Sequence, residues 1–356
     1  MRIYVTTQGS SIIKEGGHLL VRCGRESQRT IFLNKLSQLI LCGNVSLTPP
    51  ARNALFRNGT DTVFLTRNGR YLGRFNQPEP KNIELRKRQF ELAKDPEFTL
   101  RTARAIVAGK LANQATVLMR LHRKRPESGL DQQAEALRNI ISQLDGCSGI
   151  DELRGYEGQG SALYFEVFNQ GFDSEQGFGK RIRRPPTDPV NAMLSLLYTF
   201  LYNQVYSAIR QAHLDPYLGN LHAMDYGRYS LALDLMEEFR PIVADTLVFA
   251  LFNLGVLKRD EDFVCREESV EEETEEEGAP EDREDESGTP VPPPVLLKPE
   301  SLKKVIAQFE RKMATLFTYE PEDLKISYSE ALVRQARLYR LCVEGSVNAY
   351  IPVVLR

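Results

Sequence analysis

The segment Tyr71-Leu-Gly-Arg-Phe-Asn-Gln-Pro-Glu-Pro80 separates two kinds of sequence. Before it, short apolar runs are bounded by glycine and asparagine, which is typical of β-strands and hairpins. After it, apolar residues recur about every three and a half positions, which is typical of helices. The two prolines stiffen the junction. This change predicts an α+β protein in which a small N-terminal β-strand domain, residues 1–77, and a linker, 78–82, precede a larger all-α domain, 83–356.

The β domain has recognisable turn and helix signals. Its strand-like runs are Ile3–Val5, Ile12–Glu15, His18–Val21, Thr62–Leu65 and Tyr71–Phe75. Gly16-Gly17 predicts a hairpin, and Asn68-Gly69 predicts a second hairpin closed by a type I′ turn. Proline early in Pro49–Asn58 and glycine directly after it predict one helix inside this domain.

The second domain is expected to consist of long helices. The segments with helical spacing are 83–94, 98–124, 131–144, 151–170, 189–213, 230–256, 300–317 and 327–345. Two of the most apolar runs contain Asn, Gln or Asp, so we expect buried helices in a cytoplasmic protein without a membrane span. The first residues resemble a strand and not a signal peptide. Five cysteines without a Cys-x-x-Cys pair are expected to be reduced.

One acidic tract makes the net charge of the chain slightly negative, although the rest of the chain is basic. Between Arg266 and Gly288 there are 13 acidic and two basic residues and few apolar ones, so residues 266–294 are predicted to be a disordered acidic and proline-rich insertion. The rest of the chain has 44 basic and 35 acidic residues, a sign expected of a protein that meets phosphate backbones. The tract is interpreted as a solubilising loop, or alternatively as a DNA mimic that covers a basic groove.

Two segments contain acidic residues in unusual surroundings. In Ser230–Pro241, Asp234 and Glu237 are three positions apart and share one helix face, and Glu238 is four from Asp234. Burial of these carboxylates among leucines would call for a cation, whereas an acidic stripe facing water would not. Similarly, Glu157 lies among three glycines, where it would either point inward or complement the dipole at a helix start. Residues alone leave these alternatives open.

One further segment contains a histidine near these acids, and several common catalytic motifs are absent from the sequence. His222 ends the segment Asp215-Pro-Tyr-Leu-Gly-Asn-Leu-His222, twelve residues before Asp234. The chain has no Walker A loop, no Gly-x-Ser-x-Gly elbow and no His-Glu-x-x-His motif.

Together, these segments resemble the CRISPR-associated endonuclease and integrase of spacer acquisition, the CRISPR-associated protein one family. The resemblance spans most of the chain. The residues that carry it are Tyr4-Val5-Thr6, Gly16–Leu19, Glu157-Gly158, Ala162, Tyr164-Phe165, Asp215–His222, the long block Ser230–Pro241, and Gln335–Arg337.

The resemblance implies a β domain that dimerises and a helical domain in which Glu157, His222 and Glu237 bind Mn²⁺ or Mg²⁺, with Asp234 beside them as a further catalytic residue. The family pattern selects Glu237 over Glu238, which spacing could not do. One imidazole with carboxylates suits these hard cations better than Zn²⁺. The acidic tract departs from the family pattern and raises the question of access to the DNA groove.

The implied reaction inserts short DNA fragments into a CRISPR repeat array by attack of a 3′-OH on a phosphodiester. The implied partners are double-stranded DNA and a dimer of CRISPR-associated protein two, flanked by two homodimers of this protein in a heterohexamer. The alternatives are a standalone structure-selective DNase of DNA repair and a metal-free DNA scaffold.

Two basic segments, Arg101–Arg125 and Lys180–Arg184, are candidates for contacts with the DNA backbone. Arg101–Arg125 has seven basic residues and no acidic one. Solubility alone would also explain both segments. The individual candidates are Arg120, Arg123, Lys124, Arg181, Arg183 and Arg184.

Overall fold

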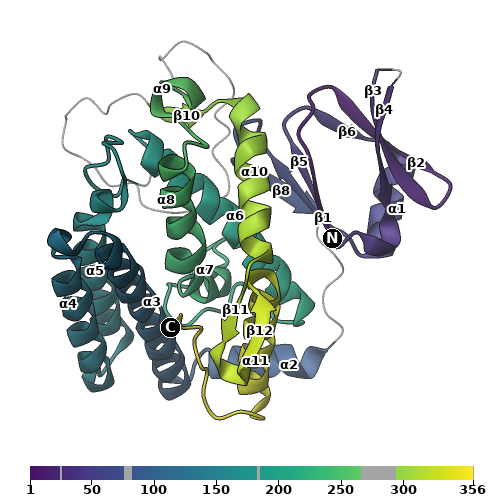
Figure 1. Ribbon diagram of the computed structural model, residues 1–356. Helices are drawn as coiled ribbons and strands as arrows, with labels where there is room; N and C mark the ends of the chain where they lie inside the picture. Colours follow the sequence, from purple (N-terminus) through teal and green to yellow (C-terminus); the bar gives the residue numbers. More distant parts are fainter. Residues whose placement is uncertain (25, 76–81, 183–184, 266–293, 356) are drawn as a thin grey trace. The chain divides into compact units, whose positions relative to one another are not determined.

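The computed structural model describes residues 1–24, 26–75, 82–182, 185–265 and 294–355 (Figure 1). The chain forms two compact units, one of Met1–Glu79 with Leu297–Lys304 and one of Pro80–Leu296 with Val305–Arg356. The first is built mainly of strands and the second mainly of helices, so the predicted fold class is confirmed. The sequence did not predict that Leu297–Lys304 would group with the first unit. Most of the predicted acidic insertion, 266–293, lies outside the described residues.

The first unit contains two four-stranded sheets. One has the order β1-β5-β7-β8, with β8 antiparallel to β7 and the other pairs parallel. The other has the order β4-β3-β2-β6. The bounds are β1 Arg2–Val5, β2 Ser10–Glu15, β3 His18–Cys23, β4 Glu26–Phe32, β5 Gln38–Cys42, β6 Val45–Leu47, β7 Asp61–Leu65 and β8 Tyr71–Phe75.

The predicted turns and helix are largely confirmed. Strands β2 and β3 pair across Gly16-Gly17, where Gly16 adopts a φ of +54°. Helix α1 spans Pro49–Asn58 and ends at Gly59, whose φ is +64°. The type I′ prediction at Asn68-Gly69 was wrong. Only Gly69 of the pair has a positive φ, and its N–H donates to the carbonyl of Thr66, so the turn places a single left-handed residue after two right-handed ones.

Residues from both sheets and from α1 form one hydrophobic core in the first unit. Ile3 and Leu39 come from the first sheet, Ile12 and Leu19 from the second, and Leu55 from α1. All are almost fully buried. Buried and partly exposed residues alternate along β1 and the start of β2, which turns one face of each strand toward the core, whereas all five residues of β5 are buried.

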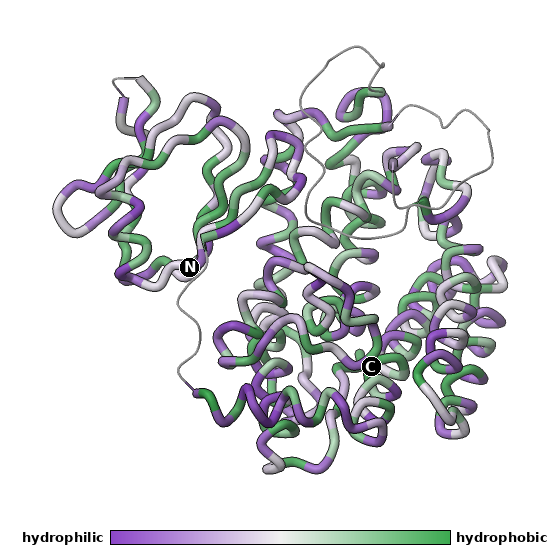
Figure 2. Tube along the Cα trace, turned by 180° about the vertical axis from the view of Figure 1, so that it is seen from behind, coloured by the Kyte–Doolittle hydropathy of each residue, from purple (hydrophilic) through white to green (hydrophobic). Residues whose placement is uncertain are grey.

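Helices make up most of the second unit, and hydrophobic and hydrophilic positions are interspersed along them (Figure 2). Their bounds are α2 Ile83–Leu92, α3 Pro96–Lys124, α4 Leu130–Gln143, α5 Ile150–Glu166, α6 Pro189–Gln211, α7 Ser230–Met236, α8 Thr246–Asn253, α9 Arg259–Asp262, α10 Pro299–Ala314, whose first residues group with the first unit, and α11 Tyr328–Glu344. Helix α3 begins with Pro96 and is capped by Asp95, whose carboxylate accepts the N–H of Glu97. It packs against α4 and α5, while α6 packs against α7 and α11. None of these helices is long and apolar enough to cross a membrane.

The segment predicted as one helix over 230–256 is interrupted. Helix α7 ends at Met236, a turn contains Glu237 and Glu238, and a π-helical segment, Arg240–Asp245, leads into α8. Pro241 explains the break, because it has no N–H to donate to the carbonyl four residues earlier. Such π-helical interruptions often occur at functional sites.

The helical unit also contains strands that the sequence analysis did not predict. Strands β9 Phe263–Cys265 and β10 Val295–Leu297 pair, as do β11 Leu316–Tyr319 and β12 Leu324–Ser327. The description of this domain as all-α is therefore incomplete. These strands are only three or four residues long, which leaves too few positions for a clear alternating pattern.

Candidate metal centre

Glu157 lies in the middle of α5 and faces α3. Its Oε1 accepts a hydrogen bond from Ser161 Oγ at 2.8 Å and also pairs with Lys110. Gly160 allows the two helices to approach, since a Cβ at this position would clash with Leu111. The helix begins at Ile150, more than one turn earlier, so the alternative role at a helix start does not apply.

His222 lies on the loop before α7 and is held by Asp234. Its Nδ1 is 2.7 Å from Asp234 Oδ1, and its backbone N–H donates to the same oxygen. Asp234 Oδ2 accepts the backbone N–H groups of Asn220 and Leu221. Because a carboxylate oxygen accepts, Nδ1 must carry the proton, and Nε2 is left free to bind a cation. Asp234 thus positions His222 and has both oxygens engaged.

Glu237 is almost fully buried at this centre. Its side chain is 2% exposed, with Oε1 3.0 Å from Arg240 Nη1 and 3.8 Å from His222 Nε2. Oε2 lies 2.7 Å from Lys110 Nζ, but the angles do not make a well-directed hydrogen bond. Burial opposes ionisation, yet the charges of Arg240 and Lys110 outweigh it and lower the pKa of Glu237 to about 2. The carboxylate is therefore ionised at neutral pH.

Lys110 was missed as a site residue by the sequence analysis. It belongs to the basic segment considered for DNA contacts, yet its side chain is 7% exposed and its ammonium pairs with both Glu157 and Glu237. Burial lowers the pKa of Lys110, but Glu237 and Glu157 outweigh it and raise that pKa above its ordinary value. The available signal was its position in the run Ala108–Ala112, where it is the one charged residue.

Glu238 points away from the centre and is fully buried. Its Oε1 accepts hydrogen bonds from Gln335 Nε2 and Tyr350 Oη, each at 2.8 Å, and Oε2 accepts the N–H of Val353. Burial raises the pKa of Glu238 to about 7. Asp234, Glu237 and Glu238 are all buried, so the alternative of an acidic stripe facing water is wrong.

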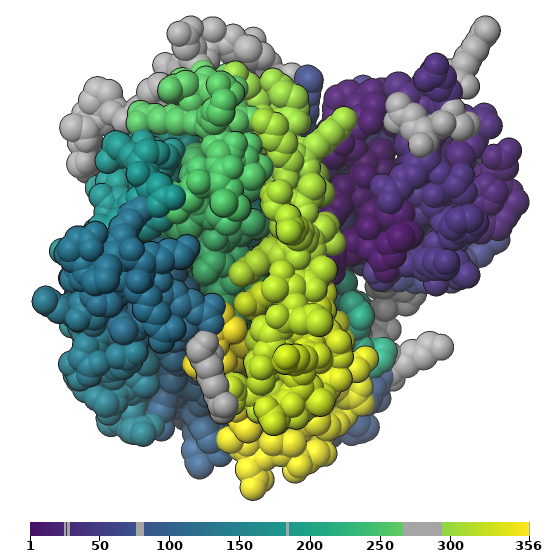
Figure 3. Space-filling model, viewed as in Figure 1, coloured from purple at the N-terminus to yellow at the C-terminus, as the bar shows by residue number. Residues whose placement is uncertain are grey.

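The C-terminal segment 350–355 packs on α3 behind this acid. Asn113 Nδ2 donates to the carbonyls of Glu238 and Val353, and its Oδ1 accepts the N–H of Leu355. Figure 3 shows the end of the chain, in yellow, beside the blue surface of α3 and α4. This contact connects the last residues of the chain to the residue next to Glu237.

A polar and aromatic network lies on the other side of Glu237. The guanidinium of Arg240 stacks over the ring of Tyr198 at 4.9 Å, and Tyr198 Oη donates to Asp245 at 2.7 Å. Burial raises the pKa of Asp245 to about 6. Sequence reasoning quoted Arg240 only as part of a motif, although the structure makes it a direct partner of Glu237.

The donor set of this centre fits a hard divalent cation. Glu157, His222 and Glu237 present carboxylate oxygens and one imidazole nitrogen, and Glu237 Oε2 lacks a directed hydrogen bond. In the described ranges, however, no three acidic, histidine or cysteine side chains already form an ion-binding cluster. Lys110 lies between the two glutamates.

The predicted DNA-contact residues differ in their surroundings. Arg120, Arg123 and Lys124 are exposed near the end of α3. Arg181 donates to the carbonyl of Ile182 and to Asn191 Oδ1, which commits part of its guanidinium within the protein. The other two candidates, at 183 and 184, lie outside the described residues.

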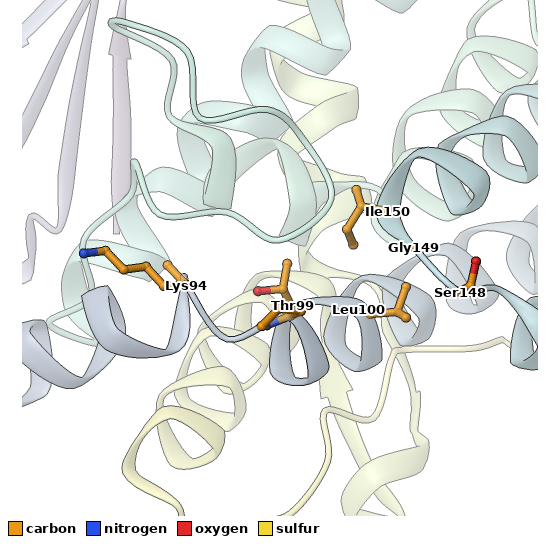
Figure 4. Close-up of a pocket in the computed structure, with 8 residues that line it drawn as sticks. Lys94, Thr99, Leu100, Ser148, Gly149 and Ile150 are labelled. Carbon is orange, nitrogen blue, oxygen red and sulfur yellow. The ribbon is translucent and has the colours of Figure 1, made fainter.

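A cavity of about 230 Å³ lies elsewhere, at the start of α3 (Figure 4). Its lining includes Lys94, Thr99, Leu100, Ser148 and Ile150. None of the predicted site residues lines it. The chemistry of the chain is therefore better sought at the charged centre than in this cavity.

Comparisons with known proteins show which family this chain resembles in sequence and in fold. A family model described as CRISPR associated protein Cas1 matches residues 3–277. A CRISPR-associated endonuclease Cas1 from Thermus thermophilus is 32% identical over 99% of this chain and 97% of its own length. One from Chlorobaculum tepidum is 32% identical over 99% and 98%.

Two solved structures share the fold. A Cas1 protein from Thermotoga maritima superposes with a TM-score of 0.78 at 22% identity, covering 100% of both chains. A casposase bound to an integration product superposes with a TM-score of 0.82 at 23% identity, covering 98% of this chain and 92% of that one.

Proposed function

The chain belongs to the family of CRISPR associated protein Cas1, and from that premise we propose that it is a metal-dependent DNA endonuclease and integrase, which inserts short DNA fragments into a CRISPR repeat array. The curated relatives that resemble it over nearly their full length are endonucleases by name. The observation that carries the proposal is the convergence of Glu157, His222 and Glu237 in one buried, charged centre.

Glu157, His222 and Glu237 would hold Mn²⁺ or Mg²⁺, which supplies a Lewis acid that stabilises charge on the reacting phosphate oxygens. Asp234 keeps the proton on His222 Nδ1 and so aims Nε2 at the centre. Arg240, which stacks over Tyr198, compensates the negative charge of Glu237 and so keeps that carboxylate ionised. These contacts orient the donor atoms before substrate binds.

In the reaction, the oxygen of a DNA 3′-OH bonds to phosphorus in the target strand while the opposite P–O bond breaks. The attacking hydroxyl loses its proton, and the leaving 3′ oxygen is protonated. Water in place of the 3′-OH would produce a nick. Among the residues that the structure describes, the candidates for holding the DNA backbone are Arg120, Arg123 and Lys124. Arg183 and Arg184, which lie outside the described residues, remain candidates from the sequence.

Partners follow from the same premise. Double-stranded DNA and CRISPR-associated protein two, Cas2, are the proposed partners, and one solved relative is titled as a Cas6-RT-Cas1–Cas2 complex. We extend this to two homodimers of this protein that flank one Cas2 dimer in a heterohexamer. Light scattering of the protein alone and mixed with Cas2 would test both assemblies, and a monomer that never binds Cas2 would refute them.

The test of the activity is strand transfer of a fluorescent short duplex into a supercoiled repeat plasmid, with Cas2 and with Mn²⁺, Mg²⁺ or EDTA. We expect joining at repeat borders in Mn²⁺ or Mg²⁺, with loss in Glu157→Ala and His222→Ala. Glu166→Ala, an exposed acid on the same helix as Glu157, is the matched control and should retain joining. Metal-dependent nicking of junctions without joining would favour a standalone repair DNase.

A further inference from the structure

We propose that Lys110 is a resident counter-ion of the centre, which holds Glu157 and Glu237 together before a divalent cation binds and then competes with that cation for them. The proposal rests on the proposed metal-dependent function but concerns a residue that the cation must displace.

Lys110 projects from α3 into the centre and is almost completely buried. Its Nζ contacts Glu157 Oε1 on α5 and lies 2.7 Å from Glu237 Oε2 beyond α7. A buried lysine is tolerated only when its charge is paired. Here one ammonium joins carboxylates that are 80 positions apart in sequence. The ammonium therefore occupies the space between the two carboxylates that would bind a cation.

Each carboxylate of the centre already has partners without a metal. Asp234 is compensated by three backbone N–H groups and by His222. Glu157 and Glu237 are then matched by Lys110 and Arg240. A divalent cation would add two positive charges a few Å from two existing ones, which Coulomb repulsion opposes strongly at low dielectric. One resident cation must give way.

Lys110 is better suited to move than Arg240. Arg240 pairs with Oε1 of Glu237 and is stacked over Tyr198 at 4.9 Å, so it can remain in place. The ammonium of Lys110, by contrast, lies against the oxygens that face the space between both acids. Its flexible four-carbon stem permits a swing that a planar, stacked guanidinium does not. The side chain of Glu157 is 25% exposed, which leaves one side of the centre open to solvent.

The experiment measures Mn²⁺ binding to the full-length protein without DNA, by calorimetry and by electron paramagnetic resonance of free Mn²⁺. Lys110→Met removes the charge and keeps much of the volume. We expect it to bind Mn²⁺ about tenfold more tightly than wild type, because the competitor is gone. Without metal, its Tm should fall, because two buried acids lose their counter-ion. Lys110→Arg keeps the charge and should not tighten binding.

Controls separate this proposal from the metal site itself. Lys87→Met, at an exposed position on α2, should leave Mn²⁺ affinity unchanged, and Glu157→Gln should weaken it. If Lys110→Met is folded but binds Mn²⁺ no more tightly than wild type, the proposal fails while the metal site stands. If wild type binds no Mn²⁺, both fail. Lys110→Gln serves as the uncharged variant if the methionine variant does not fold.

Discussion

Two consecutive glutamates, Glu237 and Glu238, are equally buried yet face opposite chemical surroundings. Glu237 faces Lys110, Arg240 and His222, and its pKa is lowered to about 2. Glu238 faces only neutral donors, and its pKa is raised to about 7. Burial acts in the same direction on both acids, so the nearby cations decide which one is charged. The difference supports the proposed role of Glu237 in the cation site, whereas Glu238 holds the C-terminal segment.

The strongest test of this contrast replaces each acid by its amide. Glu237→Gln should reduce strand transfer by roughly a thousandfold, since it removes a ligand and leaves Lys110 and Arg240 without their anion. Glu238→Gln should retain most of the activity, because neutral donors can also bond an amide oxygen. The plasmid assay with Cas2 measures both. Equal losses would show that the two acids do not differ in role.

A second test removes the link behind Glu238. Asn113 is fully buried and makes three hydrogen bonds that connect α3, Glu238 and the C-terminal segment. Asn113→Ala should lower the free energy of unfolding by about 2–3 kcal/mol, because it leaves buried backbone groups unpaired. Urea unfolding measures the loss. Ser142→Ala, at an exposed position of α4, is the control, and an equally small effect of both variants would contradict the assigned role.

A third test concerns the close packing of α5, which carries Glu157, against α3. Gly160→Ala would place a methyl group against Leu111 and should cost about 1 kcal/mol of stability through overpacking. Gly158→Ala has open space at the same helix and should instead stabilise the protein by about 0.5–1 kcal/mol. Thermal unfolding of the matched pair reports the sign. Stabilisation by both changes would mean that α5 and α3 are not in close contact.

A fourth test concerns a third buried carboxylate, Asp245. Burial raises the pKa of Asp245 to about 6, above its ordinary value of 3.8. Its contribution to stability is therefore full below about pH 4 and is lost as the pH rises through about 6. Asp245→Asn should flatten this part of the stability–pH curve. Urea unfolding between pH 4 and 7 tests this, and an unchanged slope would contradict it.

Much of the centre could be anticipated from the sequence. The spacing of Asp234 and Glu237 placed both on one helix face, and the glycines around Glu157 suggested an inward acid and a close helix. Both acids of the pair face His222 in the structure. What spacing could not supply was the choice between Glu237 and Glu238, because a turn and a π-helical segment follow Met236 and redirect the two side chains.

Sequence by itself determined the local features of this protein: the change from strands to helices after Phe75, the hairpin at Gly16-Gly17, helix α1 and most helix limits. These depend on periodicity and on backbone preferences of neighbouring residues. Tertiary structure alone decided that Lys110 turns inward and that Glu238 holds the C-terminal segment. Those outcomes depend on charges and donors contributed by residues about 50 to 130 positions away, which no local pattern encodes.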